Sequence, residues 1–387
     1  LAEALYATAE QHRLCGLPAT LVIAAETEET PGCNHLRHLI LTSEAVNWYY
    51  SLNGYGRVDF AFNFMDADGP NGDRDWYNVG SSLADFHGDE YLFAEAAARQ
   101  ALSGADLPPT AFVERVIVIH PMTAPQDTGR LSTMAIKEHE RPYLELEIAG
   151  INGPSRLYVS SLVSLAEDDE LGVWAHELGH TLHSKYPSPD GHYTLTDRYS
   201  YKQAELHYGE VSLWDLMGTG NWAGNPGGAS PTHMSSYTKE AAGWLRYAEA
   251  TVGQEYTLTA LEHQHMGDAV LRLDSPLSDA PLCTYIIEAR DNQVFYGAPE
   301  SGVVVYLATY DHAARHAVVN KLDAETGDRP AQYWYANGSS PDRPTLYNIG
   351  LPDGAERITL AGGLRVVLLA ESFAPYRATV RVERIGP

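Results

Sequence analysis

Residues 172–193 read GVWAHELGHTLHSKYPSPDGHY, and they contain the pattern His-Glu-x-x-His. His176 and His180 are four residues apart, so on a helix they project from one face and can reach the same ion. Glu177 is displaced around the helix, where it can accept a proton from water without binding the ion. This arrangement predicts a zinc site in which the metal and a glutamate activate water for peptide hydrolysis.

The residues before this pattern predict a well-formed helix around it. Ser164 and Glu167 form a capping box, and the acidic run 168–170 places negative charge at the helix N-terminus. An apolar stripe from Leu171 to Leu182 faces the core. A chance copy of the pattern would usually lack such a helix, so we prefer the zinc interpretation to coincidence.

Two histidines do not complete a tetrahedral zinc site, because a third protein ligand must leave one position for water. The helix is expected to end near Ser184, since Tyr186 precedes Pro187 and the residue before proline avoids the α region. His183 lies on the same helix as His180 and cannot easily close the site. The residues alone leave these downstream candidates open: His183, Asp190, His192, Asp197, Glu205 and His207.

A glycine-rich turn, LWDLMGTGNWAG, spans residues 213–224 and contains Met217. In metzincin-like peptidases a methionine-containing turn lies beneath the zinc. Taken alone, Met217 would be a core residue, but beside His-Glu-x-x-His we interpret it as a Met-turn. His233 and Tyr237 follow shortly after and are candidates to donate hydrogen bonds to the oxyanion; the alternative for both is packing or substrate contact.

A second candidate metal site lies in DADGPNGDRD, a loop dense in carboxylates and glycine. Clustered hard oxygen ligands on a flexible loop suit Ca²⁺, although the spacing is not that of an EF-hand. The alternative is a solvated acidic loop without a metal. The candidate calcium ligands are Asp66, Asp68, Asn71, Asp73 and Asp75.

The pattern of apolar residues predicts an α/β catalytic domain over residues 1–250 and an all-β sandwich over residues 251–387. Apolar strands are expected near 19–26, 57–64, 112–121 and 156–165, alternating with helices near 1–13, 43–54 and 92–102. Beyond Ala250 short apolar or alternating runs are separated by Gly, Pro, Asp and Asn, without a convincing helix.

The composition and charge of the chain exclude several classes of protein and of binding partner. With 387 residues and a net charge of −25, the chain can hold two domains and is expected to avoid nucleic acid and anionic lipid. No apolar run approaches the roughly 18 residues of a membrane span. Cys15 and Cys33 are either a disulfide or reduced thiols, with Cys283 unpaired. Because the chain begins with Leu1 and has no signal segment, we expect that a leader was removed or the N-terminus trimmed.

Several stretches together resemble the immune-inhibitor-A-type family of secreted bacterial metallopeptidases. They are VNWYYSLNGYGRVDF (46–60), WDLMGTGNW (214–222), PTHMSSYTKEAAGWL (231–245) and the strand pair that contains Glu-x-Arg (285–311). The resemblance implies a zincin-type endopeptidase that acts on proteins or peptides, is exported from a prokaryotic cell and carries a trailing β-sandwich. It also implies that His176 and His180 bind zinc, Glu177 is the base and Met217 is the turn methionine.

The chain departs from the family pattern after the zinc helix. The family continues with Gly and then an Asp ligand, where this chain has His183 and Tyr186. Downstream, LTDRYSY (195–201) resembles the family's L-P-D-x-Y segment, which implies that Asp197 is the third ligand and that residues 183–194 are an insertion. His192 and the remaining candidates stay as alternatives. An inactive surface or adhesion protein that acts through its β-sandwich is the alternative function, as is a peptidase or amidase restricted to one partner.

Overall fold

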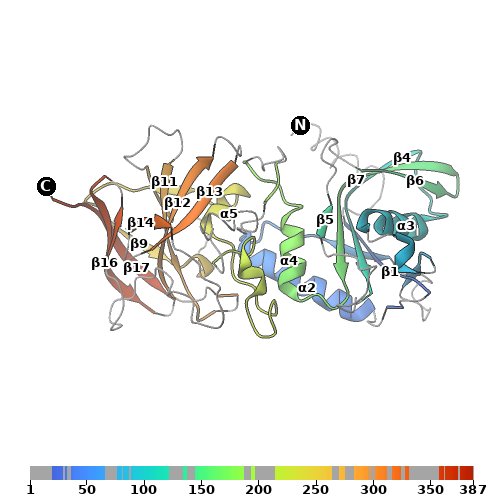
Figure 1. Cartoon of the computed structure of the whole chain (residues 1–387), viewed down its shortest axis with the longest axis horizontal. Helices are drawn as coiled ribbons and strands as arrows, with labels where there is room; N and C mark the ends of the chain where they lie inside the picture. The colour runs from blue at the N-terminus through green and yellow to red at the C-terminus, as the bar shows by residue number, and fades with distance from the viewer. Residues whose placement is uncertain are drawn as a thin grey trace. The chain divides into compact units, whose positions relative to one another are not determined.

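The fold of the chain is given by a computed structural model (Figure 1). The described residues are 20–28, 31–32, 36–65, 76–80, 82–86, 89–121, 134–136, 144–186, 193–196, 214–263, 270–274, 283–294, 296–297, 301–311, 316–323, 327–330, 357–360, 362–373 and 375–386. They form two compact units. The first contains the described residues up to Trp48 and from Val58 to Thr181, and the second those from Tyr49 to Arg57 and from Leu182 onward. The predicted boundary near Ala250 stays a prediction.

The first unit is built on a mostly parallel sheet with the order β2-β1-β4-β7-β5. Strands β1 (Thr20–Glu26), β2 (Phe62–Met65), β4 (Thr110–His120) and β7 (Gly153–Ala166) run parallel to their neighbours. Three further strands extend it: β3 (Tyr77–Asn78) pairs parallel with β1, whereas β5 (Met134–Ile136) and β6 (Leu144–Gly150) pair antiparallel with the two halves of β7.

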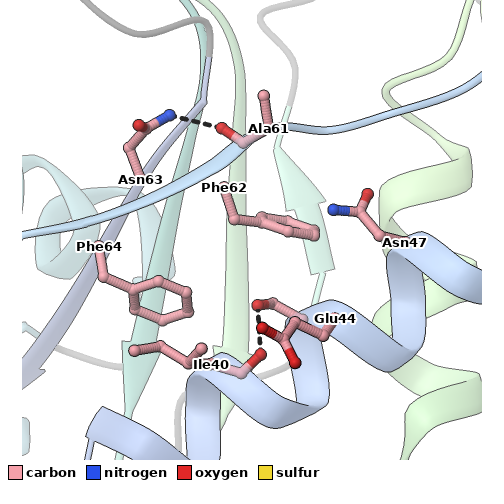
Figure 2. A pocket seen from close by; sticks show the side chains of 8 residues that line it. Ile40, Glu44, Asn47, Ala61, Phe62, Asn63 and Phe64 are labelled. Carbon is pink, nitrogen blue, oxygen red and sulfur yellow. Dashed lines mark hydrogen bonds between the residues drawn. The ribbon is translucent and has the colours of Figure 1, made fainter.

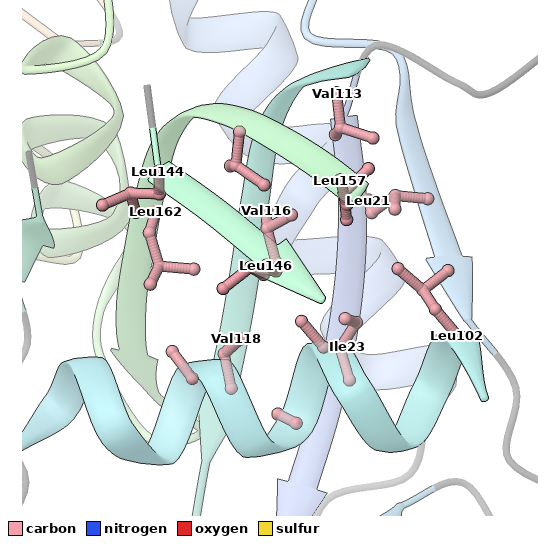
Figure 3. Packing of buried hydrophobic residues seen from close by; sticks show 14 of the residues in the cluster. Leu21, Ile23, Leu102, Val113, Val116, Val118, Leu144, Leu146, Leu157 and Leu162 are labelled. Atoms are coloured by element: carbon pink, nitrogen blue, oxygen red, sulfur yellow. The ribbon is translucent and has the colours of Figure 1, made fainter. Parts of the chain in front are cut away.

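Helix α3 (Glu90–Leu102) packs on this sheet and closes its main core. Asp89 caps the helix by accepting a hydrogen bond from the backbone N–H of Leu92. Figure 3 shows side chains from several strands and from α3 meeting in one cluster. Continuous apolar runs in β1 and β4 are what a sheet buried on both faces requires. The labelled residues include Leu21, Ile23, Val116, Val118 and Leu102.

Most of the expected elements of the first unit are confirmed, with two differences in their bounds. The helix near 43–54 is α2 (Leu36–Asn53), which begins earlier than expected. The strand expected from Arg57 begins only at Phe62. The helix expected over residues 1–13 lies outside the described residues.

The predicted capping box at Ser164 is wrong. Ser164 lies inside β7, paired with Val118 of β4 and Met134 of β5, and the zinc-pattern helix is the shorter α4 (Leu171–Gly179). The apolar run before the acidic residues extends the central strand, because pairing on both edges outweighs the local capping signal. The acidic residues instead form the turn between strand and helix, where Asp169 Oδ2 accepts a hydrogen bond from the backbone N–H of Ala166 at 2.7 Å.

The second unit contains two sheets that share one hydrophobic core. One has the order β14-β13-β12-β11-β10-β8 and the other β15-β16-β17-β9. Residues of both sheets, such as Ile287, Val305, Ile358 and Val380, belong to a single buried cluster. This is the β-sandwich expected from the sequence. The strands are β8 (Tyr247–Glu249), β9 (Glu255–Thr259), β10 (Val270–Asp274), β11 (Cys283–Arg290), β12 (Gly302–Asp311), β13 (His316–Asp323), β14 (Gly327–Pro330), β15 (Arg357–Leu360), β16 (Leu364–Ser372) and β17 (Arg377–Arg384).

Strand β11, in the middle of the six-stranded sheet, is buried on both faces. Alternate residues of β11 point to opposite sides: Tyr285 and Ile287 lie in the sandwich core, whereas Ile286 belongs to a second cluster that also contains Trp214 and Tyr237. Helix α5 (Ser236–Ala241) and the segment that begins at Trp214 therefore pack on the sheet face opposite the sandwich core.

Within the described part of the chain, no helix is both long enough and apolar enough to cross a lipid bilayer.

Candidate metal centre

Helix α4 carries the predicted metal ligands and is held by the sheet. It begins directly after β7, with Glu170 as its extended N-cap residue, and it contacts both β7 and the edge strand β5. Trp174 and Leu178 are completely buried. The apolar face of the helix therefore fixes the direction in which its histidines point.

His176 and His180 converge on one point. Their Nε2 atoms lie 3.2 Å apart, and their rings meet edge to face with centroids 4.9 Å apart. Two imidazole nitrogens bound to one tetrahedral Zn²⁺ at about 2.0–2.1 Å would lie about 3.3–3.4 Å apart. The pair thus has the spacing of two zinc ligands, and the same distance suits an N–H···N hydrogen bond in the metal-free protein. His176 is buried, while Glu177 and His180 are half-buried.

The third predicted ligand, Asp197, lies outside the described residues, as do the alternatives Asp190, His192, Glu205 and His207. Searched over the described residues, the chain has no group of three or more His, Cys, Asp or Glu side chains suited to a metal. The described alternative, His183, is exposed and stacks on Tyr193 with ring centroids 6.4 Å apart.

After α4 the chain leaves and then returns, so that residues 193–195 lie beside residues 182–184. His183 and Thr194 form an antiparallel bridge. The backbone N–H of Ser184 donates to Tyr193 O at 2.9 Å, and that of Leu195 donates to Leu182 O at 3.2 Å. Leu195 therefore lies beside Leu182, only two residues beyond His180 in the sequence.

Met217 lies fully buried in a tight turn organised by Asp215. The Asp215 carboxylate accepts a hydrogen bond from Met217 N at 3.0 Å, and its carbonyl accepts from Gly218 N and Gly220 N at 3.0 and 3.1 Å. A Cβ atom at Gly220 would lie 2.1 Å from Thr232 Oγ1, so this position requires glycine. The glycine-rich sequence thus reflects close packing between the turn and the segment near Thr232.

The segment around His233 is held by two residues from the end of α2. Tyr49 donates its hydroxyl to Thr232 O at 2.7 Å, and the backbone N–H of Met234 donates to Asn53 Oδ1 at 2.8 Å. These contacts join two of the stretches that resemble the peptidase family. Sequence reasoning singled out both stretches but not their partnership, because residues 49–53 and 232–234 are brought together only by the fold.

The His233 ring is buried and paired with Lys239. Its Nδ1 lies 3.0 Å from Lys239 Nζ, which also contacts the Tyr55 hydroxyl at 3.2 Å. Burial, and then the neighbouring Lys239 charge, hold the pKa of His233 well below its usual value. Burial also lowers the pKa of Lys239 to about 7. If the amine donates to Nδ1, the neutral ring carries its proton on Nε2.

Tyr237 lies in α5 and is nearly buried. Its ring is close to parallel with that of Tyr186, with centroids 5.9 Å apart and planes at 12°. Burial raises the pKa of Tyr186, whose hydroxyl donates to Glu240 Oε2 at 2.7 Å. Packing is thus one evident role of Tyr237, in agreement with the alternative that the sequence left open.

The structure does not describe the residues of two other predictions, the calcium loop and the cysteine pair. The candidate calcium loop from Asp66 to Asp75 lies outside the described residues, and so do Cys15 and Cys33. Cys283 is the first residue of β11.

An open pocket of about 520 Å³ lies in the first unit, between α2 and the start of β2. Figure 2 shows the rings of Phe62 and Phe64 on one side of it and residues of α2 on the other. Glu44 supplies its single carboxylate and no histidine lines it, so the pocket is not a candidate metal site. Its lining is Ile40, Ser43, Glu44, Asn47 and residues 61–64.

Comparison with known proteins adds to this geometry. Residues 109–248 match the catalytic domain of the immune inhibitor A peptidases, family M6. The resemblance predicted from the sequence is thereby confirmed over a range that includes α4, the Met217 turn and His233.

Two curated relatives agree with this match. The pre-pro-metalloprotease PrtV of two Vibrio cholerae O1 strains, M66-2 and El Tor Inaba N16961, is 32% identical to this chain over 94 residues. The aligned region covers 22% of this chain and 9% of the relative, so the chain spans less than a tenth of the length of the curated proteins it matches. Both comparisons support the predicted enzyme class, a metalloprotease hydrolase.

Proposed function

We propose that this chain is a zinc-dependent endopeptidase in which His176, His180 and Asp197 bind zinc and Glu177 is the general base. The observation that carries the proposal is the 3.2 Å convergence of the two histidine Nε2 atoms, in a segment that matches the M6 peptidase catalytic domain. A metallopeptidase implies a bound metal, and imidazole pairs on a helix are typical zinc ligands.

The excursion after α4 supports Asp197 as the third ligand. Leu195 lies beside Leu182, which follows His180 by two residues, so the excursion brings the chain back close to the end of α4. Asp197 is two residues beyond Leu195. His183 is a weaker candidate, since it belongs to the bridge with Thr194 and stacks on Tyr193.

The chemistry follows from the residue types. A bound Zn²⁺ supplies a polarised substrate carbonyl and a more acidic water. Glu177 accepts a proton from the attacking water and passes it to the leaving amine as the peptide bond breaks. We propose His233 Nε2–H and the Tyr237 hydroxyl as donors to the oxyanion, and Met217 as the methionine beneath the metal.

The sheet suggests how a peptide would bind. Among the described residues β5 pairs only with β7, and it contacts α4. An extended peptide can add as a further strand to an open sheet edge, with its scissile bond held near the neighbouring helix. We therefore propose unfolded or extended protein segments as substrates.

Export and calcium binding complete the proposal. The family resemblance implies a secreted enzyme of prokaryotic origin, and the loop from Asp66 to Asp75 has the ligand types that Ca²⁺ prefers. The alternative, an inactive adhesion protein, is not favoured, because His176, Glu177 and His180 are all present and both comparisons lead to metallopeptidases.

Hydrolysis of casein by the purified chain tests the proposal. We expect the chain to cleave casein. A zinc chelator should abolish this cleavage and added Zn²⁺ should restore it, whereas an isomer of the chelator that cannot bind zinc should have no effect. Cleavage that survives complete removal of metal, or the absence of any cleavage by the zinc-loaded protein, would contradict it.

A further inference from the structure

We propose that Glu288 and Arg290, on strand β11 of the sandwich, position the peptidase centre by holding the backbone of the segments that carry Met217 and His233. We call these two residues the β11 clip. The inference rests on the proposed peptidase function, and it makes Arg290 a positioning residue that need not touch substrate.

The clip binds backbone groups from two separate segments. Arg290 Nη1 donates to Trp214 O at 2.8 Å, and its Nη2 donates to His233 O at 3.1 Å. Glu288 Oε2 accepts a hydrogen bond from Ser236 N, the first residue of α5, at 2.9 Å. One face of β11 thus fixes the residue three before Met217, the backbone of His233 and the start of the following helix.

The clip is itself tightly held. Arg290 and Glu288 have fully buried side chains and pair with each other at 2.9 Å. Arg290 Nε also donates to Glu262 Oε1 at 2.7 Å, and Glu288 Oε1 accepts from the Tyr306 hydroxyl at 2.8 Å. Buried charges persist only where partners and hydrogen bonds replace lost water. A guanidinium is suited to this place because its planar fork can reach two carbonyls and two carboxylates at once.

Hydrogen bonds to the Trp214 and His233 carbonyls fix the position of the backbone, and we expect this position to affect turnover more than side-chain packing does. Other backbone contacts of the His233 segment come from Tyr49, from Asn53 and from the Tyr296 carbonyl, which accepts from His233 N at 2.9 Å. Thr232 N also donates to Gly220 O at 3.0 Å. Without Arg290, the His233 and Trp214 carbonyls would be buried and lose a donor, so the segment would shift to find new partners. A displacement of about 1 Å at a reacting group can lower turnover roughly 100-fold.

The clip also gives the β-sandwich a role. The strand that fixes the Met217 and His233 segments contributes Tyr285, Ile287 and Ala289 to the sandwich core from its other face. The sandwich would then be part of the structure that organises the centre, and separation of the two would not leave a competent peptidase.

The test compares Arg290→Lys and Glu288→Gln with a matched control, Arg381→Lys. Arg381 is also a sandwich arginine between two carboxylates, with Nη1 3.0 Å from Glu255 and Nη2 2.5 Å from Glu383, but it lies in the four-stranded sheet. For each full-length variant we would measure hydrogen exchange over residues 214–236, zinc content, and kcat and KM on a fluorogenic peptide, well below its melting temperature.

We expect Arg290→Lys to raise exchange over residues 214–236 while β16 and β17 stay protected. We expect kcat to fall by about 10- to 100-fold with zinc content unchanged, and Arg381→Lys to change neither quantity. The inference would be overturned if Arg290→Lys exchanged hydrogen over residues 214–236 at the same rate as the wild type, or if its kcat equalled that of the wild type.

If Arg290→Lys unfolds globally, Glu288→Gln decides by the same two measurements, since it keeps the side-chain size. An inactive wild-type chain would contradict the proposed function instead, and the exchange of residues 214–236 would still decide whether the clip holds the segment.

Discussion

The Nε2 atoms of His176 and His180 lie 3.2 Å apart at the end of α4, close to the spacing of two ligands on one zinc ion. His180 is already the C-cap residue, yet it keeps right-handed helical backbone angles, φ −62° and ψ −17°. The helix backbone therefore holds the pair at this spacing, and in the proposed zinc site the chain beyond α4 supplies the third ligand.

Zinc content identifies that ligand. We expect Asp197→Ala to lose zinc affinity by orders of magnitude, as His176→Ala does, because three protein ligands are needed for a stable site. His183→Ala and His192→Ala should keep stoichiometric zinc, measured by atomic emission after dialysis against a weak chelator. Retention of zinc by Asp197→Ala together with its loss from His192→Ala would refute the insertion argument.

Much of the fold could be predicted from periodicity. The buried runs of β1, β4 and β7 and the alternating strands of the sandwich carry their own signal, because side-chain direction follows directly from strand geometry. The start of helix α4 could not be predicted in this way. Ser164 and Glu167 satisfy a local capping pattern, but Ser164 pairs in the sheet on both edges of β7.

A second prediction concerns the oxyanion donors. With Lys239 donating to Nδ1, the His233 proton lies on Nε2 and can be donated to the oxyanion, so we expect His233→Ala to lower kcat by roughly 100-fold or more, in the range found for loss of one oxyanion donor. Tyr237→Phe keeps the ring that packs on Tyr186 and should lower kcat less than His233→Ala. Steady-state kinetics at saturating zinc measures both effects, and unchanged kcat in both variants would leave only the packing role.

A third prediction concerns pH and Lys239. Burial lowers the pKa of Lys239 to about 7 in the folded chain, whereas an unfolded lysine titrates near 10.4. Between these values the unfolded chain binds the additional proton, so this group makes the folded state more stable as pH rises from about 7 towards 10. Below that window the penalty of burying the charge is fully present.

Urea unfolding of wild type and Lys239→Met at pH 7.5 and 9.5 isolates this effect, since other titrating groups cancel in the difference. Within this pH window, the free energy of unfolding of the wild type should rise relative to that of the variant by up to about 1.4 kcal/mol per pH unit. A difference that does not change with pH would show that Lys239 keeps its charge when buried.

A fourth prediction concerns calcium. If the loop from Asp66 to Asp75 binds Ca²⁺ only in the folded chain, added Ca²⁺ should raise the melting temperature at fixed zinc concentration. Asp68→Asn combined with Asp73→Asn should remove most of that rise and leave the calcium-free melting temperature nearly unchanged. A wild-type melting curve that ignores Ca²⁺ would favour the solvated acidic loop.

Only part of the candidate site could be predicted from the sequence. His176, Glu177 and His180 are one helical turn, so their spacing carries the chemistry. Lys239, Glu288 and Arg290 act through tertiary contacts between stretches far apart in sequence, and no local pattern states those pairings. A buried Glu-x-Arg pair on a strand was the available signal, because charges on the inner face of a strand need buried partners.

The central claim is that Glu177 moves the proton while His176 and His180 hold the metal. Its most direct test is the Glu177→Gln variant, with zinc content and peptide hydrolysis measured on the same sample. The amide keeps the size of the side chain but cannot accept a proton, so we expect one zinc per chain, as in the wild type, and a turnover number lowered by about 100- to 10,000-fold. Normal turnover with stoichiometric zinc would contradict the assignment.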